Sequence, residues 1–360
     1  MNVAVIDADL IGRKRHRFPN LAVMKMSAYH KSAGDTVTLE TDYGNITNYD
    51  KVLISKVFTD TPVPDEVLSQ TNVEYGGTGF YFDKAPPLPV EIEHIMPDYH
   101  IYDDWIAAHP VKSRTEYKEY TDYSIGFMTR GCFRGCKFCV NQNYRRVVEH
   151  SPLSEFYDPT RKKICLLDDN FLGCPNWKPL LEELIATGKR FKFKQGLDER
   201  ILTPEKCELL FSAKYDDCFT FAFDNYRDRD IIIDKLDLIR RYTDSKKIIF
   251  YVLVGFDLDG KWDMDFWRRD VIEMFERIFI LGRYNVSPYI MRYEQYKESP
   301  FYGLYVTVAG WCNLFSAAKK KTLREYAETH NRPFPLRYLN EAAELFHEVT
   351  RYYDKKIYAE

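Results

Sequence analysis

Three cysteines lie close together in a segment that could bind a metal cluster. Residues 131–139 read GCFRGCKFC, which places Cys132, Cys136 and Cys139 in the spacing C-x3-C-x2-C. Three thiolates on one tight loop suit a cubane iron–sulfur cluster, which ordinarily takes four cysteines. With three thiolates, one iron stays open for a substrate or cofactor, as a reactive cluster requires. Gly131 and Gly135 allow the loop to curl closely around such a cluster.

A zinc or iron–sulfur binding module without catalytic activity is an alternative for this segment. Zinc usually has four protein ligands, whereas 131–139 has neither a histidine nor a fourth cysteine nearby. The other cysteines are scattered along the chain at Cys165, Cys174, Cys207, Cys218 and Cys312. Scattered cysteines usually behave as small buried hydrophobic residues, so the sequence predicts a single cluster.

The cysteine segment follows the first of six strand-like runs that alternate with helix-like runs. The strands are expected at 123–128, 164–167, 191–194, 219–223, 248–254 and 288–292. This alternation predicts a parallel sheet closed or nearly closed into a barrel, with fewer strands than a full (β/α) barrel has. The cysteines would lie at the carboxyl end of the first barrel strand, where the chemistry of such barrels takes place.

The fold class that the sequence predicts is α/β, in four consecutive parts. Residues 1–85 are expected to form a small Rossmann-like domain with strands at 2–7, 36–39 and 51–58. Residues 86–120 are rich in proline and acidic residues and read as a linker. A partial (β/α)6 barrel is expected over 121–310, followed by a helical segment over 311–360, where apolar residues from Leu339 to Tyr353 form one stripe.

The cysteine segment resembles the signature of the radical S-adenosylmethionine (radical SAM) enzymes. The spacing, the aromatic Phe138 before the third cysteine and the alternation over about 121–293 carry the resemblance. It implies that the three cysteines hold a 4Fe-4S cluster whose fourth iron binds S-adenosylmethionine. Reductive cleavage would then give methionine and a 5′-deoxyadenosyl radical that abstracts hydrogen from an unknown substrate. The resemblance also implies an oxygen-sensitive enzyme and an electron donor such as flavodoxin or ferredoxin.

Polar residues follow the other predicted strands, and the resemblance implies that they hold S-adenosylmethionine. Asp169 and Asn170 stand where the superfamily contacts the methionyl amine, in an Asp-Asp-Asn sequence instead of the common Gly-Gly-Glu. Gln195 and Arg200 would hold the ribose and the carboxylate, and Asp224 would join them after the fourth strand. Gly255 would allow the fifth strand to approach adenine. The alternative is that these residues cap the helices that follow the strands.

The resemblance extends to the radical SAM subgroup that has an α/β domain ahead of the barrel. A cobalamin-dependent radical SAM methyltransferase is therefore an alternative function. Many cobalamin proteins ligate cobalt through the histidine of a D-x-H-x-x-G loop, and residues 7–12 read DADLIG, with Asp9 in the place of that histidine. A carboxylate is a poor substitute for imidazole on cobalt. Cobalamin is possible but not favoured, and the domain is expected to cover the barrel mouth or position substrate.

Composition gives no indication of a nucleic-acid or membrane partner. The chain has 51 basic and 54 acidic residues, for a net charge of −3, which gives no global attraction to anionic surfaces. The run Lys319-Lys320-Lys321 is expected to be a solvated helix face. The longest apolar run, near 248–256, is too short to span a membrane, and the first residues read as a strand. We expect a cytoplasmic protein.

A single cluster is the first testable prediction. Anaerobically reconstituted protein should carry about four irons, and replacing any one of Cys132, Cys136 or Cys139 with alanine should abolish the brown chromophore, because each thiolate holds an iron. Iron analysis measures the iron content, and the visible absorbance spectrum measures the chromophore. About eight irons per chain would mean that the scattered cysteines meet in space and form a second cluster.

Overall fold

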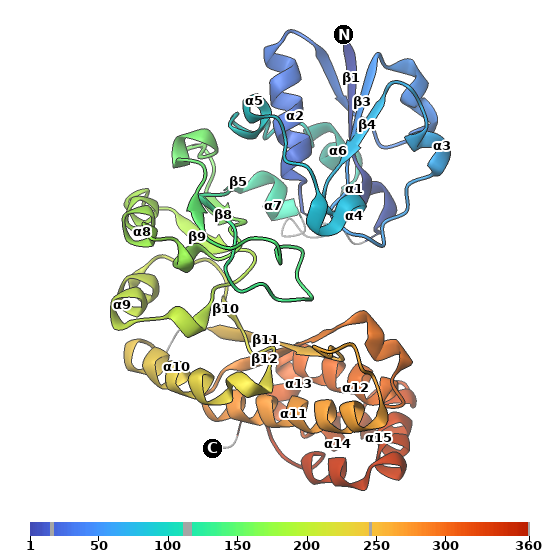
Figure 1. The fold of residues 1–360 in the computed structure, drawn as a ribbon, viewed down its shortest axis with the longest axis vertical. Helices are drawn as coiled ribbons and strands as arrows, with labels where there is room; N and C mark the ends of the chain where they lie inside the picture. The colour runs from blue at the N-terminus through green and yellow to red at the C-terminus, as the bar shows by residue number, and fades with distance from the viewer. Residues whose placement is uncertain (15–17, 111–116, 245–246, 359–360) are drawn as a thin grey trace. The chain divides into compact units, whose positions relative to one another are not determined.

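The computed structural model describes residues 1–14, 18–110, 117–244 and 247–358. The protein is of mixed α/β type and divides into two compact units, Met1–Lys194 and Gln195–Glu360 (Figure 1). Parallel sheets form the frame of both units, because helices or long loops connect most successive strands.

The first unit opens with a four-stranded parallel sheet in the order β2-β1-β3-β4. Its strands are β1 (Asn2–Asp7), β2 (Thr36–Leu39), β3 (Lys51–Ser55) and β4 (Val73–Gly76). The strand expected over 51–58 ends at Ser55, because the N–H groups of Val57 and Phe58 turn away and donate to the carboxylate of Asp9. The sequence did not predict β4, which is short and has no buried residue.

Different helices cover the two faces of this sheet. Helix α2 (Leu21–Ser32) packs on one face (Figure 1), and it begins where the Asn20 side chain accepts hydrogen bonds from two backbone N–H groups. Short helices, among them η1 (Tyr43–Asn48) and α3 (Asp65–Leu68), cover the other face. The other short elements before residue 86 are α1 (Ala8–Gly12), α4 (Thr78–Tyr81) and η2 (Phe82–Lys84).

The segment expected to be a linker contributes to the core of the first unit. Its helices are α5 (Val90–Glu93), α6 (Asp103–Ala108) and α7 (Lys118–Thr121). Four tyrosines of this segment are buried against Val3, Val5 and Leu53 of the sheet, namely Tyr99, Tyr102, Tyr117 and Tyr120. The aromatic ring of each tyrosine is buried. This part of the chain therefore packs against α2 and the sheet as part of one core.

A second parallel sheet completes the first unit in the order β5-β8-β9. Its strands are β5 (Tyr123–Gly126), β8 (Lys163–Leu166) and β9 (Arg190–Phe193). Helix α8 (Trp177–Ala186) joins β8 to β9, while the short strands β6 (Thr129–Arg130) and β7 (Val148–Glu149) pair between β5 and β8. The remaining elements here are η4 (Leu153–Glu155) and η5 (Phe171–Gly173).

The second unit is built on the parallel sheet β10-β11-β12. Its strands are β10 (Phe219–Ala222), β11 (Ile248–Val254) and β12 (Ser287–Arg292). The crossover helices are α10 (Arg229–Tyr242) and α11 (Met264–Arg283), and α9 (Pro204–Ser212) precedes β10 with Thr203 as its N-cap. The short helices are η6 (Glu199–Ile201), η7 (Tyr226–Asp228) and η8 (Glu294–Glu298).

Helices make up the end of the second unit, as the sequence predicts. They are α12 (Tyr302–Asn313), α13 (Phe315–Lys320), α14 (Leu323–Glu328), α15 (Phe334–Leu345) and η9 (His347–Tyr352). The stripe expected from Leu339 to Tyr353 is not one helix, because Phe346 has extended backbone angles (φ −154°, ψ 86°) that end α15. Leu339, Val349 and Tyr353 are nevertheless all buried.

The six strands predicted after residue 121 are all present within two residues of the expected bounds. They form two parallel sheets of three strands, and the division between the units falls between β9 and β10. Along the described ranges, no helix combines the length and the apolar character that crossing a bilayer would require.

Glu199 is a buried carboxyl that makes the stability of the second unit depend on pH. Only 1% of its surface is exposed, and its Oε2 accepts the N–H of Ala222 at 3.1 Å. Burial raises the pKa of Glu199 from 4.5 to about 8, and the neighbouring Asp198 adds to the rise. A carboxyl whose pKa is higher in the folded chain stabilises the fold at low pH, and this stabilisation is lost as the pH rises through the folded pKa.

We therefore predict that Glu199→Gln flattens the pH dependence of stability. Between about pH 5 and pH 8, the free energy of unfolding of the wild type should fall by on the order of 2–4 kcal/mol more than that of the variant, because glutamine can still accept from Ala222 but does not ionise. Urea denaturation of cluster-free protein measures this, with the exposed Glu208→Gln as the control. Parallel pH profiles for wild type and Glu199→Gln would contradict the prediction.

Candidate metal centre

The cysteine segment forms a loop that is closed at its base. Thr129 and Arg130 in β6 pair antiparallel with Glu149 and Val148 in β7, so the chain leaves and returns at neighbouring points. Gly131 begins the loop with φ +96°, and a Cβ there would lie 2.4 Å from the carbonyl oxygen of Arg146. Any larger residue would therefore push the two sides of the base apart. Gly135 also has a positive φ, +61°, as its predicted role in the curl requires.

Two adjacent carboxylates after β8 hold this loop. Asp169 accepts the N–H of Gly131 at 2.8 Å through Oδ2 and the side-chain amide of Asn141 at 2.7 Å through Oδ1. One carboxylate thus joins the residue before the first cysteine to a residue just after the third. Bonds to an ionised acceptor are stronger than bonds between neutral groups, so Asp169 fixes both ends of the cysteine segment.

Asp168 fixes the strand that leads into the loop. It is fully buried and accepts the N–H of Met128 and both the N–H and the hydroxyl of Thr129, at 2.6–3.2 Å. Burial raises the pKa of Asp168 to about 7, although the three hydrogen bonds favour its charged form. The sequence showed the Asp168-Asp169 doublet but gave no sign that both residues face the preceding strand and loop.

The thiols of the loop receive N–H donors. The N–H of Arg134 points at the sulfur of Cys132 (3.5 Å), and the N–H of Asn141 points at the sulfur of Cys139 (3.4 Å). The side-chain amide of Asn170 lies 3.5 Å from the sulfur of Cys132. Such donors stabilise thiolate charge and tune iron–sulfur clusters. All three cysteines are partly exposed, as is Phe138 between them, so the loop is open to ligands from solvent.

The donor set fits an iron–sulfur cluster in its chemistry. It consists of three thiols on one closed loop, with N–H groups directed at two of the sulfurs. Within the described part of the chain, no three Cys, His, Asp or Glu side chains converge tightly enough to share one metal ion.

The scattered cysteines are mostly core residues. Cys165, Cys174, Cys207 and Cys312 are buried, and Cys218 is half-buried. Burial raises the pKa of Cys207 to about 11 and also raises the pKa of Cys312 in α12. A thiol held in its protonated form is a poor nucleophile and a poor metal ligand, as expected for a structural residue.

The remaining predicted cofactor residues belong to the second unit. Gln195 is exposed directly after Lys194. Arg200 pairs with Asp198 at 3.1 Å, Asp228 at 3.2 Å and Glu199 at 3.6 Å. These carboxylates raise the pKa of Arg200 above its ordinary value although burial opposes them. At neutral pH the charge of Arg200 is thus shared chiefly with Asp198 and Asp228, because the raised pKa of Glu199 keeps that carboxyl protonated.

Asp224 and Gly255 are tied together by a buried network from α11. Arg277 is 1% exposed and donates to the carbonyl oxygens of Phe223, Asp224 and Leu253. Asp270 lies 3.8 Å from Arg277 and accepts the N–H of Gly255 at 2.8 Å. Burial raises the pKa of Asp224 to about 6. The network fixes the carboxyl ends of β10 and β11.

The glycine at position 255 has a local structural explanation. Its φ is +78°, and a Cβ would lie 3.1 Å from the Cβ of Tyr296. The positive φ alone strains any other residue at this position. The close neighbour in this structure is thus a tyrosine of η8.

Protein side chains make buried hydrogen bonds at the carboxyl edge of the first sheet. The strand order places a crevice beyond β1 and β3, where doubly wound sheets bind ligands. Tyr102 enters there and donates its hydroxyl to Asp7 at 2.9 Å, while Asp9 accepts from Val57 and from the hydroxyl of Thr61. Burial raises the pKa of Asp7 to about 7. The loop after β3 is therefore tied across the crevice.

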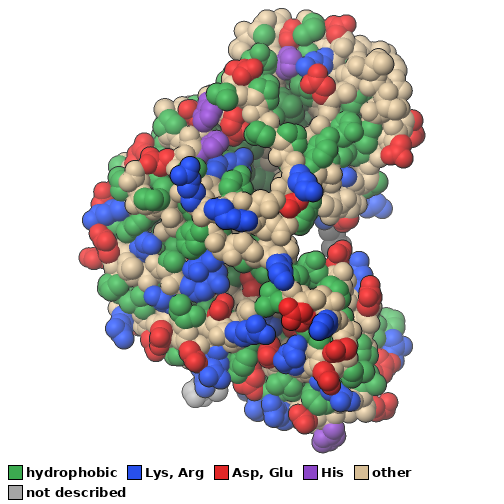
Figure 2. Space-filling view, in the orientation of Figure 1, with side chains coloured by type: hydrophobic (Ala, Val, Ile, Leu, Met, Phe, Trp, Pro, Cys, Tyr) green, Lys and Arg blue, Asp and Glu red, His purple; other side chains and the backbone are tan. Residues whose placement is uncertain are grey.

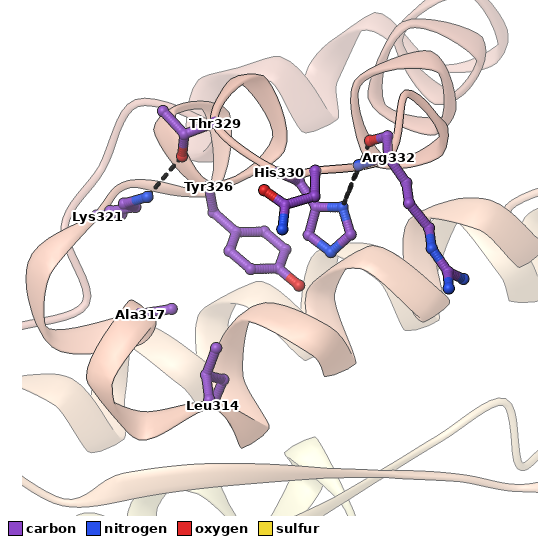
Figure 3. A pocket seen from close by; sticks show the side chains of 8 residues that line it. Leu314, Ala317, Lys321, Tyr326, Thr329, His330 and Arg332 are labelled. Carbon is purple, nitrogen blue, oxygen red and sulfur yellow. Dashed lines mark hydrogen bonds between the residues drawn. The ribbon is translucent and has the colours of Figure 1, made fainter.

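A surface pocket of about 500 Å³ lies among the C-terminal helices (Figure 3). Leu314, Ala317 and Tyr326 form its apolar side, and Lys321 donates to the hydroxyl of Thr329 across it. None of the predicted site residues lines it. On the face shown in Figure 2, basic and acidic side chains are interspersed, which agrees with the even overall charge.

Comparisons with known proteins found only weak structural similarity. No protein-family model and no curated protein matches the chain. Structures of the cobalamin-dependent S-adenosylmethionine radical enzyme OxsB resemble it. The form with aqua-cobalamin and S-adenosylmethionine bound is 11% identical, with a TM-score of 0.36 over 98% of this chain and 56% of that chain. The apo form is 12% identical, with a TM-score of 0.37 over 99% and 57%. The chain thus spans about half the length of these structures.

We predict that Asp169 stabilises the loop in the absence of any cofactor. Asp169→Ala should lower the free energy of unfolding of cluster-free protein by about 2–4 kcal/mol, since two hydrogen bonds to a charged acceptor are lost. Asn141→Ala removes one of these bonds and should cost less. In the double variant the losses should not add, because the residues share a bond. Additive losses in urea denaturation would show that the two side chains do not interact.

Proposed function

We propose that this chain is a radical S-adenosylmethionine enzyme whose cluster is held by Cys132, Cys136 and Cys139. The observation that carries the proposal is the three-thiol loop, which has no fourth cysteine and is closed at both ends by Asp169. A cluster bound there as 4Fe-4S would supply the electron that cleaves S-adenosylmethionine to methionine and a 5′-deoxyadenosyl radical, which abstracts hydrogen from a substrate. An electron donor such as flavodoxin or ferredoxin would serve it.

Residues of the first unit would position the three thiolates and stabilise their negative charge. The N–H groups of Arg134 and Asn141 and the amide of Asn170 offset negative charge on Cys132 and Cys139. Asp169 keeps the loop closed, and each of its oxygens has a second lone pair. A methionyl amine can therefore bind Asp169 in addition to the loop, without replacing it.

We propose the division into a Rossmann-like domain over 1–85, a linking segment over 86–120, a (β/α)6 barrel over 121–310 and a helical segment over 311–360. Gln195, which is exposed, would hold the ribose. Arg200 would organise Asp198 and Asp228 rather than bind a carboxylate, since its charge is already shared. Asp224 and Gly255 would shape the adenine side through the Arg277 network.

A cobalamin-dependent methyltransferase is the less favoured version of this function. The crevice that would hold a corrin beyond β1 and β3 contains the Tyr102 hydroxyl, and Asp9 ties the loop after β3. Opening it would take the Tyr102 hydroxyl from the buried Asp7 and the Val57 N–H and Thr61 hydroxyl from the buried Asp9, which is costly. We therefore propose that the domain binds no cobalamin.

The direct test is formation of 5′-deoxyadenosine. Reconstituted protein incubated anaerobically with S-adenosylmethionine and dithionite should release 5′-deoxyadenosine and methionine, measured by liquid chromatography and mass spectrometry. Cys136→Ala should release neither, because the cluster needs all three thiolates. Cys312→Ala is the matched control and should be active, since Cys312 is a buried core thiol. A reconstituted protein that binds iron but releases no 5′-deoxyadenosine would contradict the proposal.

A further inference from the structure

The carboxylate of Asp83, in the N-terminal domain, is hydrogen-bonded to the cysteine loop. Asp83 accepts the side-chain amide of Gln142 at 3.0 Å and that of Asn143 at 2.8 Å, both through Oδ2. The Asn143 amide also lies 3.3 Å from the carbonyl oxygen of Asp83. Gln142 and Asn143 lie three and four residues after Cys139. The N–H of Gln142 donates to the carbonyl oxygen of Cys139. A shift of Asp83 would therefore be felt at the third cysteine.

The chain leading to Asp83 is firmly anchored on the sheet. It runs from β4 through Gly77, where a Cβ would lie 2.3 Å from the carbonyl oxygen of Lys56. Gly79 donates its N–H to that same carbonyl, and the Lys56 ammonium lies 4.4 Å from the centre of the Phe80 ring. These close contacts require glycine at positions 77 and 79, where the chain packs against Lys56 directly after β3.

Phe82, directly before Asp83, has a strained backbone. Its angles are φ 47° and ψ −114°, in a region that glycine ordinarily occupies. Such strain persists only where the surrounding structure holds it, and it concentrates at functional positions. The Phe82 side chain does not explain it by burial, because 38% of it is exposed. What the strained turn achieves is to direct Asp83 toward Gln142 and Asn143.

We infer that Asp83 is a positioning residue that sets the geometry of the cysteine loop from the N-terminal domain. Asp169 joins Gly131 to Asn141, and Asp83 holds the next two residues, Gln142 and Asn143, so the two carboxylates together fix the segment that follows Cys139. The consequence for catalysis rests on the proposed function, whereas the restraint of the loop does not. In this role the domain acts on the cluster loop without binding a ligand.

Hydrogen exchange of the cluster-free full chain tests the restraint. In Asp83→Ala, peptides covering 131–147 should exchange on the order of tenfold faster than in the wild type, because hydrogen bonds to a charged acceptor are lost. Asp83→Asn should stay close to the wild type, since its amide oxygen can still accept from both side chains. Peptides covering β3 and β4 should not change.

A second variant removes the same hydrogen bonds by changing the loop residues instead of Asp83. Gln142→Ala with Asn143→Ala leaves the N-terminal domain intact and should raise exchange as Asp83→Ala does, with no further increase when all three changes are combined. Wild-type exchange in the 131–147 peptides of this double variant overturns the inference, even if Asp83→Ala unfolds its own domain. If the wild-type protein takes up no iron, the proposed function is wrong. The hydrogen-exchange result would still test the restraint of the loop by Asp83.

Discussion

The carboxylate of Asp169 is the interaction on which the candidate site depends. It joins the N–H of Gly131 to the amide of Asn141, so that a stretch containing all three cysteines is closed by one charged group. Asp168 beside it anchors β6 through Thr129. Without these two acceptors the loop would depend on the short β6–β7 pairing, on its own turns and on the contacts of Asp83 with Gln142 and Asn143. The same pair also places the loop at the carboxyl end of β8, where parallel α/β proteins bind their ligands.

Buried charge organises the other sheet ends as well, and this changes how polar residues after strands are interpreted. Arg277 and Asp270 take up the carbonyl and N–H groups beyond β10 and β11. At the carboxyl ends of β1 and β3, Asp7 accepts the N–H groups of Asp9 and Leu10, and Asp9 accepts the N–H of Val57. Buried polar groups must be paired. A buried polar residue at a strand end is therefore first to be interpreted as a hydrogen-bond partner of the backbone, and only then as a ligand-binding residue. The exposed Gln195 and the partly exposed Cys132 are reached by solvent.

The sequence predicted the strands and the cysteine loop well, because both are local signals. Buried parallel strands are continuous apolar runs, and Ile248–Val254 was placed to the residue. Gly131 and Gly135 both have a positive φ, as the expected curl of the loop requires. The partners of Asp169 and Asp83 lie 28–60 residues away in the chain, and no spacing rule reveals such pairs. The break at Phe346 was missed because the apolar stripe continues through it in altered geometry.

Electron paramagnetic resonance of the reduced, reconstituted protein tests the central claim most directly, because it reports on the cluster and on its ligand at once. A reduced 4Fe-4S cluster held by three cysteines should give one spectrum alone and a different one after S-adenosylmethionine is added, since the cofactor binds where protein ligands are missing. The same signal with and without S-adenosylmethionine would contradict that claim. So would a colourless protein that binds one zinc ion in place of iron.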